Sequence, residues 1–525
     1  MDKETLSNYG WIVICVLVLA VMLALATPFG QFISDAVWNT ANGLFDTNNN
    51  ALDNVLGDLG VVPTPEQLQA KHKFEYYSTL NGAVNDVNNG TVGDNADVNK
   101  ENAVAGIYTD ENGGVNVVLL KDTTEATTIN PTVDMTINLG GHVLSSTNTI
   151  GLNITVGNVA IDGRLNGSTI QLNHTQSTKA RTIVVDTGAN LTVDSGTYVC
   201  KTEGDNSICI NSKGNLTLTN ATVIGAETTG QIRTIQVLGD KTTITNCSVT
   251  ATSNEGAVMG TAVGGPTTIS DCSIIAATKN GKAHGVYTWA QANNATITNC
   301  SISTTATDGK AYGMSNYCTA VVSDSTITAY SNYGDDGNGR YLAIATGFTN
   351  VGGTATLNDC YIMGTHSGVQ NTGTLYVNGG NYEGYGHGGF YFGGAGTISY
   401  VRNATIRERA MPDGYLDLDI ANDKGTTMCN GAGFYIGGAD NMTVYMDNCN
   451  IYGSRNPIVL RDTSNEQNNN LYISNSRINK DYTSIGVRID NDTHKLYIGT
   501  GNNFTADNTN RTSAVIQTNE TYTID

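Results

Sequence analysis

A short motif that recurs about every 25 residues is the feature that most constrains the fold of this chain. Each copy reads apolar, polar, Asn or Asp, small, polar, apolar, and the clearest copies have Cys247, Cys272, Cys300 and Cys360 at the small position. Weaker copies place other residues there: Gly196, Ala221, Ser325, Gly380, Ala404, Cys449, Ser476 and Gly501. A unit this short cannot enclose a core alone, so neighbouring copies must stack on one another.

The repeats are expected to contain short strands, and no helix of ten or more residues fits between them. A second strand-like block lies about 13 to 17 residues before each small position, as in residues 284–287 and 312–314, and turn pairs such as Asn280-Gly281 join the blocks. Leucine-rich repeats, the main rival at this period, need a leucine signature and a helical return that are missing here. We therefore expect an all-β fold, a parallel β-helix of about fifteen coils between Asp134 and Asn510, with equivalent strands pairing ~4.8 Å apart.

The composition agrees with such a stack and excludes several classes of protein. The chain has 60 Gly, 7 Pro, 14% charged residues and a net charge of −20. Hydrophobic residues make up 39% of the chain, which argues against disorder, and the glycines lack the period of three of collagen. Nucleic acid is not expected as a partner, because the 27 Lys and Arg residues are scattered rather than clustered.

The amino terminus predicts export. Residues 11–26 carry no charge, and residues 9–33 together reach the length of a membrane helix. Lys3 precedes this segment, whereas Asp35 and further acidic residues follow it, so the carboxy-terminal part is expected outside the cell. An uncleaved anchor is the favoured interpretation. A signal peptide cleaved after Ala24-Leu25-Ala26 and a helix that packs inside a surface filament are the alternatives.

Two segments resemble a known family. Residues 117–122 (VVLLKD) and 135–144 (MTINLGGHVL) resemble the entry coils of bacterial surface proteins with the right-handed parallel β-helix, or pectin-lyase-like, fold. Asn138 and Gly140 replace the Asp and Asn that are usual there. Residues 78–87 resemble the short amphipathic helix that caps such coils. The resemblance covers about residues 70–515 and implies a fold, not an activity.

These observations predict the organisation of the chain. The expected segments are a membrane anchor or signal helix at 1–45, a polar linker at 46–77, a cap with the first strands at 78–134, the parallel β-helix at 135–515 and a tail at 516–525. Five of the ten cysteines share the small position of the repeat, so buried free thiols are favoured over disulfides. Bridges between adjacent coils stay open as an alternative, because ~4.8 Å lies within disulfide range.

Weak catalytic candidates come from a comparison with polygalacturonase-like glycoside hydrolases of this fold. Asp335 and Asp336 match their paired aspartates, and His387 matches their Gly-His-Gly motif. The upstream Asn-Thr-Asp motif is absent, however, and the repeat by itself accounts for His387-Gly388, as it does for His284-Gly285. A lyase would need carboxylates that bind calcium and a basic residue, for which Asp417 is a weak candidate.

Charged and aromatic residues gather around the long insertion between Ala404 and Cys449, which is where we expect a ligand. An aromatic ring packs on a sugar ring while planar polar groups bind its hydroxyls. The candidate ligand-binding residues are Tyr385, Tyr391, Arg407, Glu408, Tyr415, Asp417, Asp419, Arg455 and Arg461. No metal or cofactor is expected, with calcium as the one alternative.

The sequence thus predicts an exported, membrane-anchored protein of the cell surface with an adhesive or structural role. Its expected partners are the membrane, through residues 9–33, and a polysaccharide or a host or cell-surface glycan; self-assembly is left open. A role without catalysis is favoured. The first alternative is a polysaccharide lyase or glycoside hydrolase that acts on an acidic polysaccharide, and the second is a subunit of a surface filament.

Overall fold

The structure is a computed structural model. It describes residues 62–174, 179–203, 206–227, 229–331, 345–385, 388–408, 432–437, 440–453, 456–461, 468–480, 487–489, 493–504 and 515–522. The chain divides into two compact units, one of Met1–Lys73 with Arg164–Asn166 and one of Phe74–Gly163 with Gly167–Asp525. The predicted membrane segment lies outside the described residues, and no helix within them is long and apolar enough to cross a membrane.

The described part of the first unit contains one helix, α4 (Pro65–Lys71). Thr64 caps it: the Thr64 side chain accepts from the Gln67 backbone N–H, and the Gln67 side chain accepts from the Thr64 backbone N–H. This reciprocal pair satisfies two N–H groups that have no partner within the helix. The helix falls within the segment expected as a linker.

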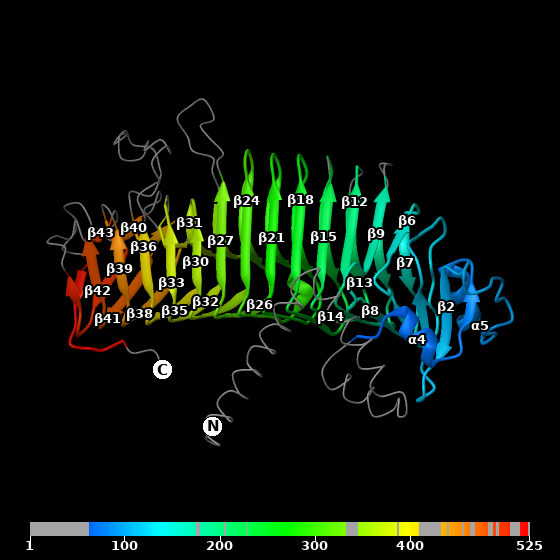
Figure 1. The fold of residues 1–525 in the computed structure, drawn as a ribbon. Coiled ribbons are helices and arrows are strands. Elements are labelled where there is room, and N and C mark those ends of the chain that lie inside the picture. Colours follow the sequence, from blue (N-terminus) through cyan, green and yellow to red (C-terminus); the bar gives the residue numbers. More distant parts are fainter. Residues whose placement is uncertain are drawn as a thin grey trace, which may run out of the picture. The chain divides into compact units, whose positions relative to one another are not determined.

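The second unit is a stack of mostly parallel strands in three sheets, with antiparallel pairing only of β2 with β1 and β3 among the described strands (Figure 1). Each full coil supplies one strand to each sheet, as β20 (Thr267–Ser270), β21 (Ser273–Thr278) and β22 (Lys282–Thr288) do. They pair in parallel with β23, β24 and β25 of the next coil. The predictions of an all-β fold and of stacked parallel repeats are confirmed.

We name the sheets A, B and C in the order in which this coil visits them. Sheet A has 18 strands: β1 (Glu75–Tyr77), β2 (Ala105–Thr109), β3 (Val115–Leu119), β5 (Met135–Asn138), β8 (Asn158–Asp162), β11 (Asn190–Asp194), β14 (Asn215–Thr219), β17 (Thr242–Thr245), β20, β23 (Ala295–Thr298), β26 (Thr319–Ser323), β29 (Thr354–Asn358), β32 (Thr374–Asn378), β35 (Ile398–Arg402), β38 (Thr443–Asp447), β41 (Asn470–Ser474), β44 (Lys495–Ile498) and β46 (Val515–Gln517).

Sheet B has 15 strands: β4 (Thr123–Glu125), β6 (Val143–Ser146), β9 (Thr169–His174), β12 (Thr197–Thr202), β15 (Thr222–Glu227), β18 (Ser248–Ser253), β21, β24 (Ser301–Ala306), β27 (Thr326–Ser331), β30 (Tyr361–Gly364), β33 (Asn381–Gly384), β36 (Thr405–Glu408), β39 (Asn450–Gly453), β42 (Arg477–Lys480) and β45 (Asn503–Phe504).

Sheet C has 13 strands: β7 (Ile150–Ile154), β10 (Arg181–Val185), β13 (Ser207–Ser212), β16 (Ile232–Val237), β19 (Val258–Val263), β22, β25 (Lys310–Asn316), β28 (Ala345–Asn350), β31 (Ser367–Asn371), β34 (Phe390–Phe392), β37 (Phe434–Gly437), β40 (Ile458–Arg461) and β43 (Val487–Ile489). A 3₁₀ turn, η1 (Ala290–Ala292), follows β22.

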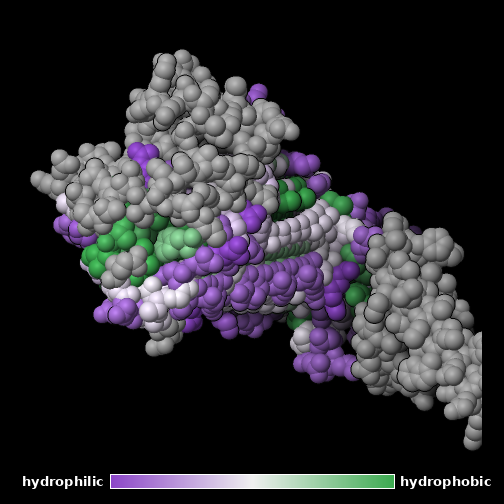
Figure 2. Space-filling model, turned by 90° about the vertical axis from the view of Figure 1, so that its left-hand side faces the viewer, coloured by the Kyte–Doolittle hydropathy of each residue, from purple (hydrophilic) through white to green (hydrophobic). Residues whose placement is uncertain are grey.

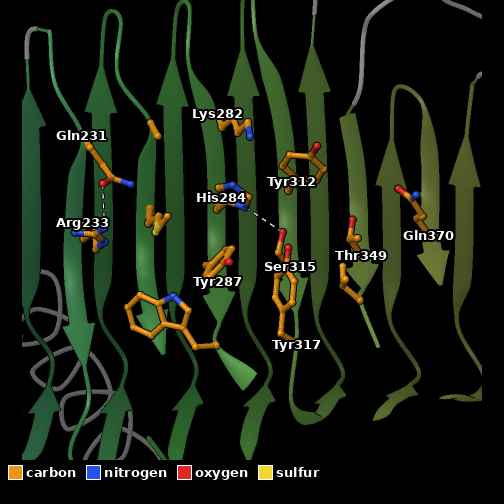
Figure 3. Close-up of a pocket in the computed structure, with 14 residues that line it drawn as sticks. Gln231, Arg233, Lys282, His284, Tyr287, Tyr312, Ser315, Tyr317, Thr349 and Gln370 are labelled. Carbon is orange, nitrogen blue, oxygen red and sulfur yellow. Dashed lines mark hydrogen bonds between the residues drawn. The ribbon is translucent and has the colours of Figure 1, made fainter. Parts of the chain in front are cut away.

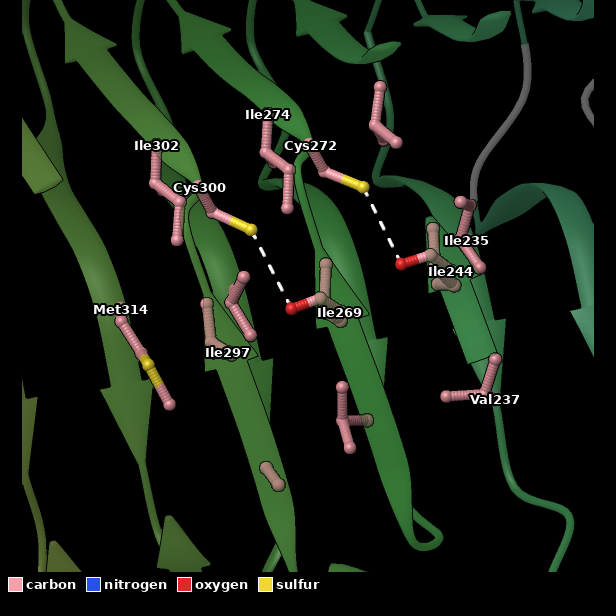
Figure 4. Close-up of a cluster of buried hydrophobic side chains, with 14 of the residues drawn as sticks. Ile235, Val237, Ile244, Ile269, Cys272, Ile274, Ile297, Cys300, Ile302 and Met314 are labelled. Atoms are coloured by element: carbon pink, nitrogen blue, oxygen red, sulfur yellow. Dashed lines mark hydrogen bonds between the residues drawn. The ribbon is translucent and has the colours of Figure 1, made fainter. Parts of the chain in front are cut away.

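The repeated motif forms the sharp corner between sheets A and B. Its Asn or Asp is in the left-handed conformation, with φ of 52° at Asn246, 56° at Asp271 and 51° at Asn299. Apart from Gly, Asn and Asp tolerate this conformation best, which explains why they recur there. The next residue is small and buried, and the Cys272 and Cys300 thiols point to carbonyl oxygens of the preceding coil (Figure 4). The eight cysteines among the described residues are all free and buried, as expected.

Alternation along each strand separates core from surface. In sheet C, Phe390 and Phe392 are buried while Tyr391 between them is half-buried on the outer face. Ile, Val, Leu and Phe side chains fill the interior along the stack. The outward residues form parallel rows, many of them hydrophilic (Figure 2). Each position of the coil therefore points to the same side, core or surface, in successive coils.

A helix closes the amino-terminal end of this unit, as predicted. It is α5 (Leu80–Asn89), and its buried residues include Leu80, Val84 and Val87. Glu125 of the first strand of sheet B accepts the backbone N–H of Leu80 at 2.8 Å, so a buried carboxylate caps the helix and joins it to the stack. The cap covers hydrophobic surface that the first coil would otherwise expose.

Candidate functional site

A groove of 540 Å³ lies on the outer face of sheet C (Figure 3). Its lining comes from six neighbouring strands, β16, β19, β22, β25, β28 and β31, and from the residues beside them. At ~4.8 Å per strand the first and last of these strands are about 24 Å apart. Four aromatic side chains form its walls: Tyr287, Trp289, Tyr312 and Tyr317.

Strand register places these residues side by side. His284 of β22 is level with Met259 of β19 and Tyr312 of β25. Three positions further along the strand direction, Tyr287 is level with Ser315. Residues far apart in the sequence thus meet because each occupies the same position of its own coil.

His284 lies at the centre of the groove. Its imidazole stacks on the Tyr312 ring with the centroids 4.9 Å apart, and it meets the Tyr287 ring edge-on at 5.1 Å. Its Nδ1 is 3.0 Å from the Ser315 hydroxyl. Burial, with a smaller contribution from the Lys282 charge, lowers the pKa of His284 to about 4. The imidazole is therefore neutral at physiological pH.

The remaining aromatic rings extend the wall. The Tyr287 ring lies 6.0 Å from the Trp289 ring and 5.3 Å from the Tyr317 ring. Burial raises the pKa of the Tyr287 hydroxyl and of the Tyr312 hydroxyl. Both hydroxyls therefore stay protonated and can donate hydrogen bonds.

Planar and charged polar groups lie beside the rings. Arg233 donates to the Gln231 side-chain oxygen at 2.9 Å, Lys282 is exposed, and the amide of Gln370 lies at the far end of the groove. The buried hydroxyl of Thr349 has no hydrogen-bond partner among the described residues. Aromatic faces with a few planar polar groups are the chemistry that binds sugar rings and their hydroxyls.

The described lining of the groove offers little for hydrolysis or metal binding. It contains no Asp or Glu, so it lacks the carboxylate pair that glycoside hydrolysis needs. Nowhere in the described parts of the chain do three or more His, Cys, Asp or Glu side chains gather as metal ligands would.

The predicted binding residues that the structure describes lie on two different sheets. Tyr391 of β34 is level with Gln370, next to the groove, and its ring stacks on Tyr435 at 5.4 Å. Arg407 of β36 belongs to sheet B, where its guanidinium lies 4.7 Å from the centre of the Tyr452 ring. Two more predicted residues, Glu408 of β36 and Tyr385 just after β33, also belong to sheet B or lie beside it.

Glu408 is buried at the end of β36, and Tyr385 is half-buried just after β33. Of Arg461 the structure describes only its strand position, level with Gly437 in sheet C. The other candidates lie outside the described residues, so their roles stay predictions: Asp335, Asp336, His387, Tyr415, Asp417, Asp419 and Arg455.

The residues of the groove were not among the site residues predicted from the sequence. His284, Tyr287 and Tyr312 stood out there only as parts of recurring strands. A usable signal existed, because aligning the repeats on their small position puts His284 level with Tyr312 and Tyr287 level with Ser315 in successive copies. The same alignment also finds the row of stacked tyrosines in sheet A that runs from Tyr376 to Tyr497, so it does not single out the groove.

The chain matches no protein-family model, no curated protein and no solved structure.

Proposed function

We propose that this is an exported protein of the cell surface that binds a carbohydrate chain in the groove on sheet C. The observation that supports this most directly is the wall of four aromatic rings beside planar polar groups within one groove. Its length of about 24 Å suits several linked sugars better than a single one. Tyr391, level with Gln370, would lengthen the same surface.

The proposal keeps the predicted setting of the molecule. Residues 9–33 would anchor the chain, with the carboxy-terminal part outside the cell. The winding would be right-handed and the fold of the pectin-lyase-like kind, because connections between parallel strands of one sheet are right-handed in nearly all proteins. An adhesive or structural role fits a groove without carboxylates better than hydrolysis does.

Isothermal titration of the full chain with neutral and acidic hexasaccharides, including cello-, xylo- and galacturono-hexaose, tests the proposal. We expect at least one to bind, and Trp289→Ala or Tyr287→Ala to weaken it about tenfold through loss of stacking. Tyr376→Ala is the matched control, since Tyr376 is an exposed tyrosine of sheet A, away from the groove. It should leave binding unchanged.

Three results would count against the proposal. One is that no hexasaccharide binds; another is that Tyr376→Ala weakens binding as much as the groove variants do. The third is the appearance of unsaturated or reducing-end products during the titration, because these would establish the lyase or hydrolase alternative instead.

A further inference from the structure

His284 is placed to control the shape of the groove. Its side chain is 8% exposed, and it touches both walls: flat against Tyr312, edge-on to Tyr287, and within hydrogen-bond distance of Ser315. Exposed aromatic rings on a strand choose among several rotamers, and a ring packed on both sides is confined to fewer of them. No other described side chain of the groove contacts both tyrosine rings in this way.

We propose that His284 is the positioning residue of the groove: while neutral it holds Tyr312 and Tyr287 in place for the ligand, and its protonation releases them. The part of this proposal that concerns ligand affinity rests on the proposed function. The part that concerns the two rings does not.

The surroundings of His284 oppose a positive charge. The titratable or charged groups that line the groove around it come from its own strand, from β25 and the residue after it, and from β16: Lys282, Tyr287, Tyr312, Tyr317 and Arg233. Lys310 of β25 is level with Lys282 on the next strand. Strands β19, β21, β24 and β28 carry no Asp, Glu, Lys, Arg or His. The carboxylates of Glu255 and Asp308 belong to turns outside the lining of the groove.

Protonation would therefore place an imidazolium beside Lys282, with no carboxylate in the described lining of the groove. An unpaired buried charge is costly, so the protonated ring gains by turning toward water. Tyr312 then loses its flat partner and Ser315 its hydrogen bond. The groove would hold its shape at neutral pH and lose it in acid.

Two variants separate the ring from its charge. His284→Phe keeps an aromatic ring between the tyrosines but cannot be protonated, whereas His284→Ala removes the ring. At pH 7 we expect His284→Ala to lose the part of the near-ultraviolet circular dichroism that the packed Tyr287 and Tyr312 contribute, and about tenfold in affinity for the best-bound hexasaccharide. We expect His284→Phe to keep both.

Acid titration tests the role of the charge. Histidine-selective ¹³C NMR should show a resonance with a midpoint near pH 4 that is absent from His284→Phe. Burial also lowers the pKa of His366 to about 4, so a second such resonance should be present in both proteins. Since only the neutral form binds, wild-type affinity should fall about tenfold between pH 7 and pH 3, and that of His284→Phe should not. His142→Phe, on a histidine outside the groove, is the matched control, and far-ultraviolet circular dichroism verifies the strands at each pH.

The outcomes distinguish the two proposals. The role of His284 is overturned if its resonance titrates near 6.5, if His284→Ala keeps the tyrosine signal, or if His284→Phe loses affinity in acid as the wild type does. If no hexasaccharide binds at any pH, the proposed function fails, and the NMR titration and the tyrosine signal still decide the role of His284.

Discussion

At the scale of single residues, backbone conformation accounts for the most regular feature of the chain. The corner between sheets A and B turns through one left-handed residue in coil after coil. A side chain with an ordinary Cβ is strained in that conformation by about 1–2 kcal/mol, and Asn and Asp offset the strain with local hydrogen bonds. At Asn299 the side-chain amide also donates to Asp271 of the neighbouring coil at 2.7 Å.

A pair of substitutions at Asn299 tests this explanation. Asn299→Ala should lower the free energy of unfolding by about 1–2 kcal/mol, because it keeps the strain and loses the hydrogen bond. Asn299→Gly loses the same bond but relieves the strain, so it should cost less. Urea unfolding followed by circular dichroism compares them; an alanine variant as stable as the glycine variant would contradict the explanation.

At the scale of the element, a glycine in the middle of the sheet C strands sets how closely two sheets approach. An added Cβ at Gly285 would lie 2.3 Å from the Ile302 methyl group and 2.6 Å from the Gly313 carbonyl oxygen. An isoleucine of sheet B thus occupies the space that a side chain would need. This explains why glycine follows His284 and recurs in the neighbouring strands.

The equivalent glycine of β25 offers a direct test. A Cβ at Gly313 would lie 2.3 Å from the Ile327 methyl group and 2.4 Å from the Gly347 carbonyl oxygen. Gly313→Ala should therefore lower the free energy of unfolding by about 2–3 kcal/mol through overpacking. Gly113→Ala is the comparison, because a Cβ there meets no atom within 4 Å, and its left-handed backbone alone should cost about 1 kcal/mol. Equal losses in urea unfolding would show that close packing of the two sheets is not the reason for the glycine.

At the scale of the whole molecule, each coil contacts mainly its neighbours, so the fold and the groove are separable. Equivalent corner residues, such as Cys272 and Cys300, are followed by similar sequences and occupy similar positions. Stacked repeats tolerate the loss of one unit when the remaining neighbours can pair in the same register. The groove has no such tolerance, because it needs particular side chains from particular coils.

Deletion of one coil tests this separation. Removal of residues 273–300 takes out β21, β22 and β23, and with them His284, Tyr287 and Trp289, and joins Cys272 to Ser301. Removal of residues 197–221 takes out one coil that does not line the groove. Both proteins should keep the parallel-sheet circular dichroism. Only the first should lose hexasaccharide binding, and loss in both, or in neither, would contradict the proposed site.

Much of the fold could be predicted from the sequence because its causes are local and repeated. The period, the turn residues and the alternation in the strands each follow from conformational preferences that act within one coil. The capping helix was expected at residues 78–87 from the resemblance to the entry coils of such proteins, and α5 spans Leu80–Asn89. Because neighbouring side chains of a strand point to opposite faces, Phe390 and Tyr391 were expected to divide between core and surface, and the structure places Phe390 in the core and Tyr391 on the surface.

The sequence by itself determined the stacked parallel strands, their corners and their buried small residues, because the local conformational preferences that form one coil recur in each neighbouring coil. Only the tertiary structure decided where a ligand could bind. His284 and Tyr312 are 28 positions apart in the chain and become a stacked pair 4.9 Å apart only when two coils lie in register. The local charge density that drew attention to Arg407 carries no such register, and the structure places it on a different sheet from the groove.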